Sequence, residues 1–257
     1  MKFFFSSLRT ARSPVSLIEK MGEAGLDGWE IVDEGAQKLN EENIKLFRDA
    51  LSSTNLELSV HAPFSDLNLA SLNEGILEET RRQILESLER AHEIEAEVVV
   101  IHPGHYSPLG LQLPDKVWEH CVESFIRISK KAEELNLKAC VENMTNVFMM
   151  LCRNPEEVSE LIEEVSSENL WIALDVGHAN LNGNLFDFMK LSKIAHMHVH
   201  DNNGKEDEHL AVGEGNVDWR RFARELKKID FTGAMTLELR TIEEAVRSMR
   251  FLEKILK

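Results

Sequence analysis

Short apolar runs alternate with longer amphipathic segments along the whole chain. An apolar run of about four to eight residues indicates a buried strand, whereas apolar positions that recur about every three to four residues indicate a helix. The pattern therefore predicts strands at residues 2–6, 29–32, 57–61, 98–102, 138–142, 170–175, 194–200 and 235–239. Helical segments follow these strands and begin near residues 14, 41, 74, 116, 155, 186, 219 and 242.

Polar residues at the predicted helix starts support these boundaries. Ser13-Pro14 and Asn154-Pro155 each place a capping side chain before a proline at the first helical position. Thr241 and Glu244 have the spacing of a capping box, in which two side chains satisfy free amide groups at a helix start.

Strand and helix alternate strictly, which is typical of a parallel sheet in α/β proteins. Eight repeats in a chain of 257 residues favour a closed (β/α)8 barrel, a TIM barrel, over an open doubly wound sheet. No linker or low-complexity segment divides the sequence, so we expect one domain over residues 1–257. In such barrels the functional side chains lie at the carboxyl ends of the strands.

Ionisable side chains stand at the carboxyl ends of six consecutive predicted strands, and Asp175 lies on the face opposite that of Ile172 and Leu174. Charges gathered in one mouth each cost several kcal/mol unless they are paired or bound to a metal. We therefore expect a divalent cation beside Glu142, Asp175 and Glu238. Mixed imidazole and carboxylate ligands suit Zn, Mn, Fe or Co. The six residues are His61, His102, Glu142, Asp175, His198 and Glu238.

The seventh predicted strand carries three histidines in alternation, His196, His198 and His200, which share one face of the strand. We expect only His198 to bind the shared metal. His196 lies deeper in the strand and is expected to be a hydrogen-bonded interior residue. Asp207 and His209 follow in a glycine-bearing loop, and the pattern leaves open whether they face a metal or a substrate.

Charge and cysteine content narrow the functional classes. The formal net charge of -16 disfavours non-specific binding of nucleic acid, because that binding depends on Lys and Arg. The three cysteines have no C-x-x-C spacing, which indicates a reducing compartment without a disulfide framework. The apolar run at the amino terminus is too short for a signal peptide, and no run reaches membrane-spanning length. We therefore expect a cytoplasmic protein without a membrane partner.

Short motifs lie in a fixed order between about His61 and Arg240, while the first fifty or so residues carry none. The motifs are His61-Ala-Pro-Phe-Ser-Asp-Leu-Asn-Leu-Ala-Ser71, Ile101-His-Pro-Gly104, Val141-Glu-Asn143, Leu174-Asp-Val-Gly-His178, His198-x-x-Asp201, Asp207-x-His209 and Glu238. Together they resemble the xylose isomerase-like barrel superfamily. That superfamily includes sugar and sugar-phosphate isomerases and epimerases, together with endonuclease IV, the class II apurinic endonuclease.

The isomerase and epimerase branch implies one metal, whose ligands would be Glu142, Asp175, His198 and Glu238. The two glutamates would also be the acid and base that move a proton at carbon through a metal-stabilised enediolate. In that reaction His61 and His102 would orient hydroxyl groups or assist as acids.

The endonuclease branch implies up to three zinc ions. The three ligand sets would be His61, His102 and Glu142; Glu142, Asp175, His198 and Glu238; and His178, Asp207 and His209. All nine positions carry an acceptable ligand in this chain, so the ligand inventory permits both branches.

Two local sequences depart from endonuclease IV. Where that family has Glu-Asn-Thr-Ala-Gly and His-Leu-Asn-Asp, this chain has Glu142-Asn-Met-Thr-Asn146 and His198-Val-His-Asp201. The chain is also shorter and acidic. The sequence therefore favours a divalent-metal-dependent sugar or sugar-phosphate isomerase or epimerase with a carbohydrate substrate. A zinc-dependent apurinic/apyrimidinic endonuclease acting on DNA is the alternative, and a metal-binding barrel without catalysis is a third, weaker one.

The sequence leaves two interpretations open for each of two loops. His209 with Gly213 and Gly215 is a candidate phosphate site, or the glycines serve a simple turn. The apolar segment 144–152 lines the pocket or forms a subunit contact in a homo-oligomer. The identity of the sugar, the metal and the oligomeric state are left open.

Overall fold

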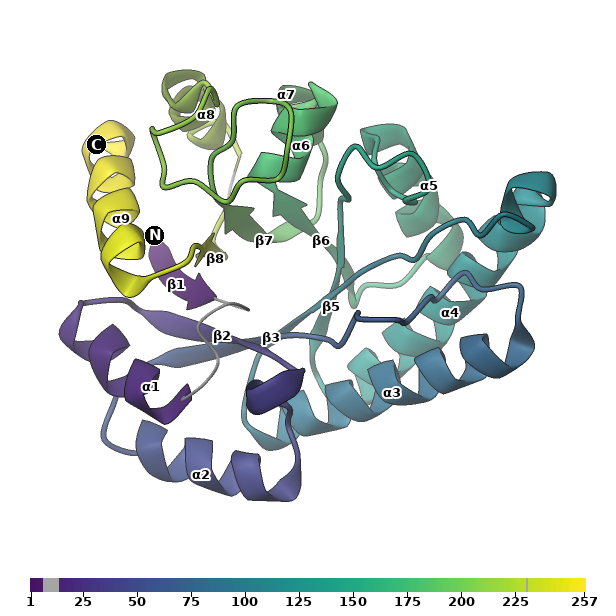
Figure 1. The fold of residues 1–257 in the computed structure, drawn as a ribbon, viewed down its shortest axis with the longest axis horizontal. Helices are drawn as coiled ribbons and strands as arrows, with labels where there is room; N and C mark the ends of the chain where they lie inside the picture. Colours follow the sequence, from purple (N-terminus) through teal and green to yellow (C-terminus); the bar gives the residue numbers. More distant parts are fainter. Residues whose placement is uncertain (7–13, 230) are drawn as a thin grey trace.

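The computed structural model describes residues 1–6, 14–229 and 231–257. Eight parallel strands form a closed barrel in which each strand pairs with its sequence neighbour and β8 pairs with β1 (Figure 1). The predicted (β/α)8 barrel is therefore confirmed. The strands are β1 (Lys2–Ser6), β2 (Gly28–Val32), β3 (Glu57–His61), β4 (Val98–Ile101), β5 (Lys138–Glu142), β6 (Leu170–Asp175), β7 (Ile194–Val199) and β8 (Ala234–Glu238).

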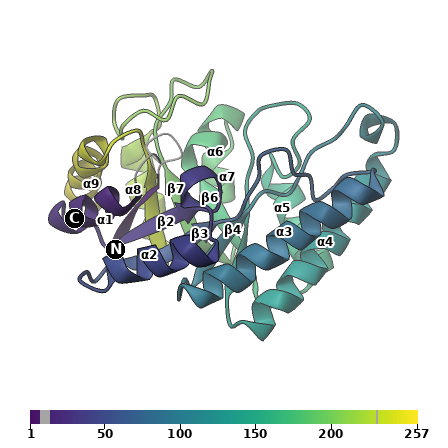
Figure 2. The ribbon, with the colours of Figure 1, turned by 60° about the horizontal axis from the view of Figure 1, so that its bottom comes forward.

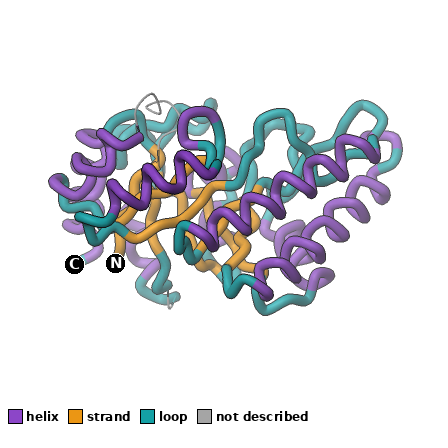
Figure 3. Tube along the Cα trace, turned by 90° about the horizontal axis from the view of Figure 1, so that it is seen from below, coloured by secondary structure: helices purple, strands orange, loops and turns teal. Residues whose placement is uncertain are grey.

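Helices surround the ring of strands, as the views in Figures 2 and 3 show. The two longest, α3 and α4, lie side by side and extend beyond the barrel on one side (Figure 2). The helices are α1 (Pro14–Glu23), α2 (Glu41–Leu51), α3 (Glu74–Glu93), α4 (Pro114–Glu134), α5 (Pro155–Val165), α6 (Val176–Asn182), α7 (Leu185–Phe188), α8 (Trp219–Leu226) and α9 (Ile242–Leu256), with short 3-10 turns η1 (Gly35–Gln37) and η2 (Gly110–Gln112). No helix in the described part of the chain is long and apolar enough to cross a membrane.

The predicted helix caps are realised in different ways. Thr241 Oγ1 accepts a hydrogen bond from the Glu244 amide at 3.1 Å, and the Glu244 carboxylate accepts one from the Arg240 amide at 3.1 Å. The Glu244 side chain thus binds the amide of Arg240, one residue before the amide that a capping box usually engages. Asn154 stands at the start of α5 but makes no side-chain capping bond, so proline at the first position marks this start. Ser13 lies outside the described residues.

The largest difference from the sequence prediction follows β6. The sequence predicts no helix before the one that begins near residue 186, whereas α6 begins at Val176, directly after the strand. Asp175 is both the last residue of β6 and the cap of α6, because its Oδ1 accepts the His178 amide at 2.7 Å. This cap fixes His178 at the edge of the barrel mouth. The second short helix, α7, ends at Phe188.

The large hydrophobic core lies between the strands and the helices, as expected for outward-facing strand residues. Inside the barrel the buried apolar cluster is small and comprises Val100, Cys140, Ala173 and Ala195, and the Phe4 ring lies there against His196. Polar side chains occupy the rest of the interior. The barrel therefore carries buried polar groups directly beneath its mouth.

Candidate metal and substrate site

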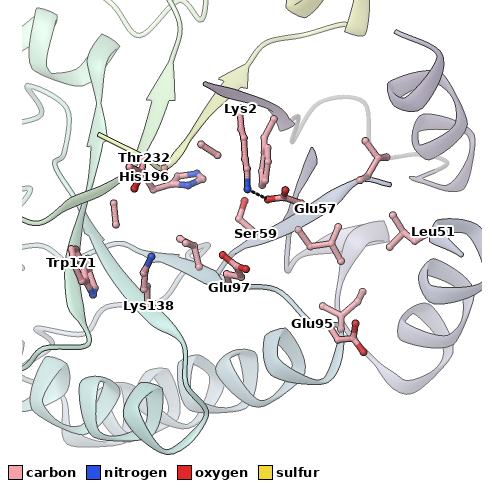
Figure 4. Close-up of a pocket in the computed structure, with 18 of the residues that line it drawn as sticks. Lys2, Leu51, Glu57, Ser59, Glu95, Glu97, Lys138, Trp171, His196 and Thr232 are labelled. Atoms are coloured by element: carbon pink, nitrogen blue, oxygen red, sulfur yellow. Dashed lines mark hydrogen bonds and ion pairs between the residues drawn. The ribbon is translucent and has the colours of Figure 1, made fainter. Parts of the chain in front are cut away.

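A cavity of about 320 Å³ opens at the carboxyl ends of the strands. Asp175 and His198, both fully buried, lie beneath it. A second cavity, of about 660 Å³, lies at the opposite end of the barrel and is lined by early strand residues such as Lys2, Glu57 and Lys138 (Figure 4). The predicted site residues that line the first cavity are His61, His102, Glu142, His178, Asp207, His209 and Glu238.

Glu142 is the central carboxylate of the site, and it is 1% exposed. One oxygen, Oε2, lies 3.0 Å from His102 Nε2 and 3.3 Å from His61 Nε2. The other, Oε1, lies 3.1 Å from His198 Nδ1. Glu142 therefore belongs to two groups of candidate ligands at once.

Three carboxylates converge on one nitrogen of His198. Its Nδ1 lies 3.1 Å from Glu142 Oε1, 3.6 Å from Glu238 Oε1 and 3.8 Å from Asp175 Oδ2. Ligand atoms bound at about 2.0–2.2 Å to one metal lie roughly 3–3.5 Å from one another. Glu142, Asp175 and His198 present ligand atoms within 4.8 Å of one another and fit a divalent cation, whereas Glu238 groups with His200 and His209 and would have to shift to complete the predicted set of four.

The third predicted ligand group gathers around Asp207. Its Oδ2 lies 3.1 Å from His209 Nε2 and 3.4 Å from His178 Nε2. The other ring nitrogens of these histidines face backbone carbonyls, with His178 Nδ1 donating to Asn143 and His209 Nδ1 donating to Glu238, each at 2.9 Å. Both rings therefore present Nε2 to Asp207, which joins this group to the main site.

The sequence prediction missed a role for His200. This buried ring lies with Nε2 3.2 Å from Asp175 Oδ1 and stacks on His209 at a centroid separation of 4.0 Å. A Cβ at Gly177 would overlap the His200 ring. Glycine in the Leu174-Asp-Val-Gly-His178 motif is therefore needed for the close approach of His200.

Glu30 was also missed, although the sequence carries a signal for it. It is the one charged residue in the otherwise apolar run of β2, and its side chain is fully buried inside the barrel. Glu30 Oε2 lies 2.8 Å from His196 Nε2, and Oε1 lies 3.0 Å from His198 Nε2. His196 is thus a partnered interior residue, as predicted.

The glycines after β7 serve the turn. The Gly213 amide donates to the buried Asp201 carboxylate at 2.9 Å, and Gly213 has a φ of 90°. A Cβ at Gly215 would overlap the Asp201 carboxylate and the Asn202 backbone. Because the Gly213 amide and the space at Gly215 are used by the loop itself, the turn interpretation is favoured over a phosphate site.

Different parts of the apolar segment 144–152 face the cavity and the solvent. Met144 and Thr145 line the cavity, whereas Val147 and Phe148 point away from the core, with Phe148 69% exposed. A subunit contact at the exposed part stays a prediction.

Two of the site histidines, His198 and His178, have raised pKa values. Burial lowers the pKa of His198, but nearby carboxylates, that of Glu238 above all, raise it well above its ordinary value. Burial also opposes a charge on His178, yet the carboxylates of Asp175 and Asp207 raise its pKa to about 10. A metal ion would therefore have to displace protons from these rings.

The central carboxylates are ionised. Burial raises the pKa of Glu142, but the charge of His198 above all holds it well below the ordinary value. The same opposition acts on Asp175, where His178 contributes most to lowering the pKa. His102 differs from the other histidines, because burial dominates and lowers its pKa.

The fold and the site together define a class, the (β/α)8 barrels with a candidate divalent-metal centre at the carboxyl ends of the strands. The chain belongs to the xylose isomerase-like TIM barrel family, whose model matches residues 18–255.

Two similar proteins cover nearly the whole chain. An uncharacterized protein of Methanocaldococcus jannaschii is 39% identical over 100% of this chain and 90% of its own. A crystal structure described as a D-tagatose 3-epimerase-like protein is 38% identical, covers 100% of this chain and 97% of its own, and superposes with a TM-score of 0.94.

Relatives with lower sequence identity are named either as sugar epimerases or as endonucleases. Fructoselysine 3-epimerase of Escherichia coli O157:H7 is 25% identical over 64% of this chain and 62% of its own. Probable endonuclease 4 of Malacoplasma penetrans is 25% identical over 70% of this chain and 66% of its own. Sugar epimerases and endonuclease 4 homologues are therefore both among the relatives of this chain.

Proposed function

We propose that the protein is a divalent-metal-dependent sugar or sugar-phosphate isomerase or epimerase. The observation that carries the proposal is the placement of two glutamates, Glu142 and Glu238, which line one small cavity and approach the same His198 nitrogen at 3.1 and 3.6 Å. The cavity of about 320 Å³ is at the small end of ligand pockets, which span ~300–1,000 Å³. It therefore suits a single sugar. The epimerase names of relatives support the same class.

The two glutamates differ in a way that suits proton transfer on two faces of a sugar carbon. Glu142 is enclosed by imidazoles, while the Glu238 side chain is 17% exposed toward the cavity. We assign Glu238 to take the proton from the carbon beside the carbonyl and Glu142 to act from the other side. Reprotonation by the second glutamate on the opposite face inverts the carbon, whereas return to a neighbouring carbon isomerises the sugar.

The histidines beside Glu142 position substrate and carboxylate. His61 Nδ1 donates to the Ala62 carbonyl at 2.9 Å, which turns its Nε2 toward Glu142. The lowered pKa of His102 keeps that ring neutral near pH 7, so it can exchange hydrogen bonds with a sugar hydroxyl. A divalent cation at Glu142, Asp175, His198 and Glu238 would supply polarisation of the carbonyl and hydroxyl oxygens next to the reacting carbon.

The alternative is a zinc-dependent apurinic/apyrimidinic endonuclease, and the gathering of His178 and His209 around Asp207 favours it. In that reaction clustered metals generate hydroxide and neutralise a leaving oxygen. The net charge of -16 opposes it, because binding a DNA backbone depends on basic side chains.

Hydrogen exchange at carbon separates the two proposals. The metal-loaded protein is incubated in D2O with a panel of free and phosphorylated ketopentoses and ketohexoses, and an oligonucleotide with one abasic site is tested in parallel. We expect deuterium at a carbon beside the carbonyl of at least one ketose, and an intact oligonucleotide. Incision of the oligonucleotide without exchange into any sugar would establish the alternative. About one metal per chain supports the sugar reaction, and about three support the nuclease.

A further inference from the structure

A layer of polar side chains lies inside the barrel, one level below the candidate metal centre. Glu30 of β2 supplies a carboxylate to this layer, and Ser59, His196 and Thr236 surround it, each at most 1% exposed. Ser59 and His196 also form part of the wall of the second cavity, at the opposite end of the barrel from the site, which is called the lower cavity below (Figure 4). Glu30 therefore stands between the lower cavity and the site above it.

One oxygen of Glu30 is already occupied. Its Oε2 accepts the Ser59 hydroxyl at 3.0 Å and lies 2.8 Å from His196 Nε2. The same His196 nitrogen lies 2.8 Å from Thr236 Oγ1. These neighbours fix the carboxylate plane, so the direction of the second oxygen is set by the layer and does not depend on the site.

The second oxygen faces His198. Glu30 Oε1 and His198 Nε2 lie 3.0 Å apart, yet the ring is not aligned for a well-directed hydrogen bond. Both atoms are fully buried, and neither has another hydrogen-bond partner among the residues that the structure describes. Buried polar groups that are left unpaired are costly, so these two atoms are the partners available to each other.

The two nitrogens of the His198 ring thus face different charges: Nδ1 faces the site carboxylates and Nε2 faces Glu30. We infer that Glu30 is a positioning residue, which holds the proton of His198 on Nε2 and so leaves the Nδ1 lone pair directed at the metal. A carboxylate behind a metal-bound histidine fixes the tautomer and ring orientation and raises the basicity of the ligand. Ser59 and His196 act in turn on Glu30.

A metal ion held by Glu30, His196 and His198 themselves is the competing explanation, because these are metal-ligand residue types close together. The contacts favour hydrogen bonds. Glu30 Oε2 already has a hydroxyl donor, and its 2.8 Å separation from His196 is shorter than the roughly 3–3.5 Å expected between two ligands of one metal.

The inference rests on the metal-binding part of the proposed function and is independent of the reaction. Zinc binding to the metal-free protein is therefore measured directly, by competition with a chelating dye, for the wild type, Glu30→Gln and Ser59→Ala. Glu30→Gln keeps the shape of the side chain and removes its charge. Ser59→Ala removes one hydrogen bond to Glu30 and leaves the charge of Glu30 in place.

We expect zinc to bind about 10–100-fold more weakly to Glu30→Gln, the usual effect of losing such a partner, and the loss of affinity in Ser59→Ala to be smaller than in Glu30→Gln. In the wild type, nitrogen-15 NMR of the zinc-bound protein should show His198 coordinated through Nδ1 and protonated on Nε2. This NMR readout needs no variant, so it stands even where Glu30→Gln fails to fold.

Coordination through Nε2, or equal zinc affinity in Glu30→Gln and the wild type, would overturn the inference. A loss of one bound metal per chain in Glu30→Gln would also overturn it, since Glu30 would then be a ligand. A wild-type protein that binds no divalent metal would instead contradict the proposed function, which keeps the two failures distinguishable.

Discussion

Glu142 illustrates how much the site depends on single residues, because its two oxygens serve different histidines. Oε2 faces His61 and His102, and Oε1 faces His198. A change at this position therefore affects both candidate ligand groups, while a change at Glu238 affects one.

We expect Glu142→Gln and Glu238→Gln each to lower kcat/KM by about 10²–10⁴-fold, the usual contribution of a general acid or base, while the fold survives. Ketose turnover at saturating metal measures this, and circular dichroism checks the fold. The control is Glu208→Gln, whose carboxylate contacts Asn203 in the loop at 2.8 Å. Wild-type-like turnover in both site variants would rule out the proposed mechanism.

Gly177 is a residue for which the structure demands the absence of a side chain. We expect Gly177→Ala to cost about 1–3 kcal/mol of unfolding free energy, because its Cβ would overlap the His200 ring in a packed interior. Urea unfolding of the metal-free protein measures this. Gly22→Ala in α1 is the control, since its Cβ meets nothing within 4 Å and alanine favours a helix by about 0.5–1 kcal/mol. Equal effects of the two substitutions would contradict the assigned overlap.

Metal binding should release protons. Against the opposing effect of burial, the charge of Glu238 above all raises the pKa of His198 well above its ordinary value. At pH 7 this ring therefore holds a proton that the metal must displace, so metal affinity rises as pH increases above 7 and falls as it decreases. Calorimetry in two buffers with different ionisation enthalpies counts the released protons. Binding without proton release at pH 7 would show that the ring is already neutral.

At the scale of elements, the contact between α3 and α4 depends on one buried guanidinium. Arg81 is 3% exposed and donates to Ser124 Oγ at 2.8 Å, with further bonds to Glu78 at 2.6 Å and Glu123 at 3.3 Å. Its neighbour Arg82 also pairs with glutamates, but the Arg82 side chain is 58% exposed.

We expect Arg81→Met to lower the unfolding free energy by about 1.5–3 kcal/mol, the range for a hydrogen bond to a charged group. Arg82→Met should change it by less than about 1 kcal/mol, because exposed ion pairs contribute little. Chemical unfolding of both variants gives the comparison. Similar losses in the two would mean that burial of Arg81 does not determine its contribution.

The elements that the sequence predicted well are those with a clear period. The bounds of β3, β5 and β6 match the prediction, since the outward-facing residues of these strands are apolar and pack against the helices. The start of α6 could not be found in this way. Asp175 ends a strand and caps a helix at once, and its capping bond to the His178 amide depends on backbone geometry that no periodicity reveals.

At the scale of the whole molecule, eight strand–helix units close into one barrel, and closure is what assembles the site. Motifs at strand ends predicted which residues would meet, because all carboxyl ends of the strands share one rim. The strand-end motifs did not predict Glu30 and His200, for different reasons. Glu30 lies below the rim of the barrel. His200 reaches the site because Gly177 has no side chain to occupy the position of the His200 ring.

The hydrophobic core of the barrel surrounds the site but does not depend on it, which predicts how metal removal affects the molecule. Because the core lies between strands and helices, the chelator-treated protein should stay folded. A metal at one hundred times its Kd should add ~2.7 kcal/mol of stability by binding only the native state. That corresponds to an increase in Tm of roughly 5–10 °C for a domain of this size.

Calorimetric melting with and without added Zn²⁺ measures the shift, and Glu238→Gln should show a smaller one because it loses a candidate ligand. Complete unfolding on metal removal would contradict this prediction, since the metal would then be needed to form the barrel itself. An unchanged Tm at saturating Zn²⁺ would mean that the metal adds no stability to the fold. The buried carboxylates and imidazoles would then be satisfied by one another, through the ion contacts around Glu142 and Asp207.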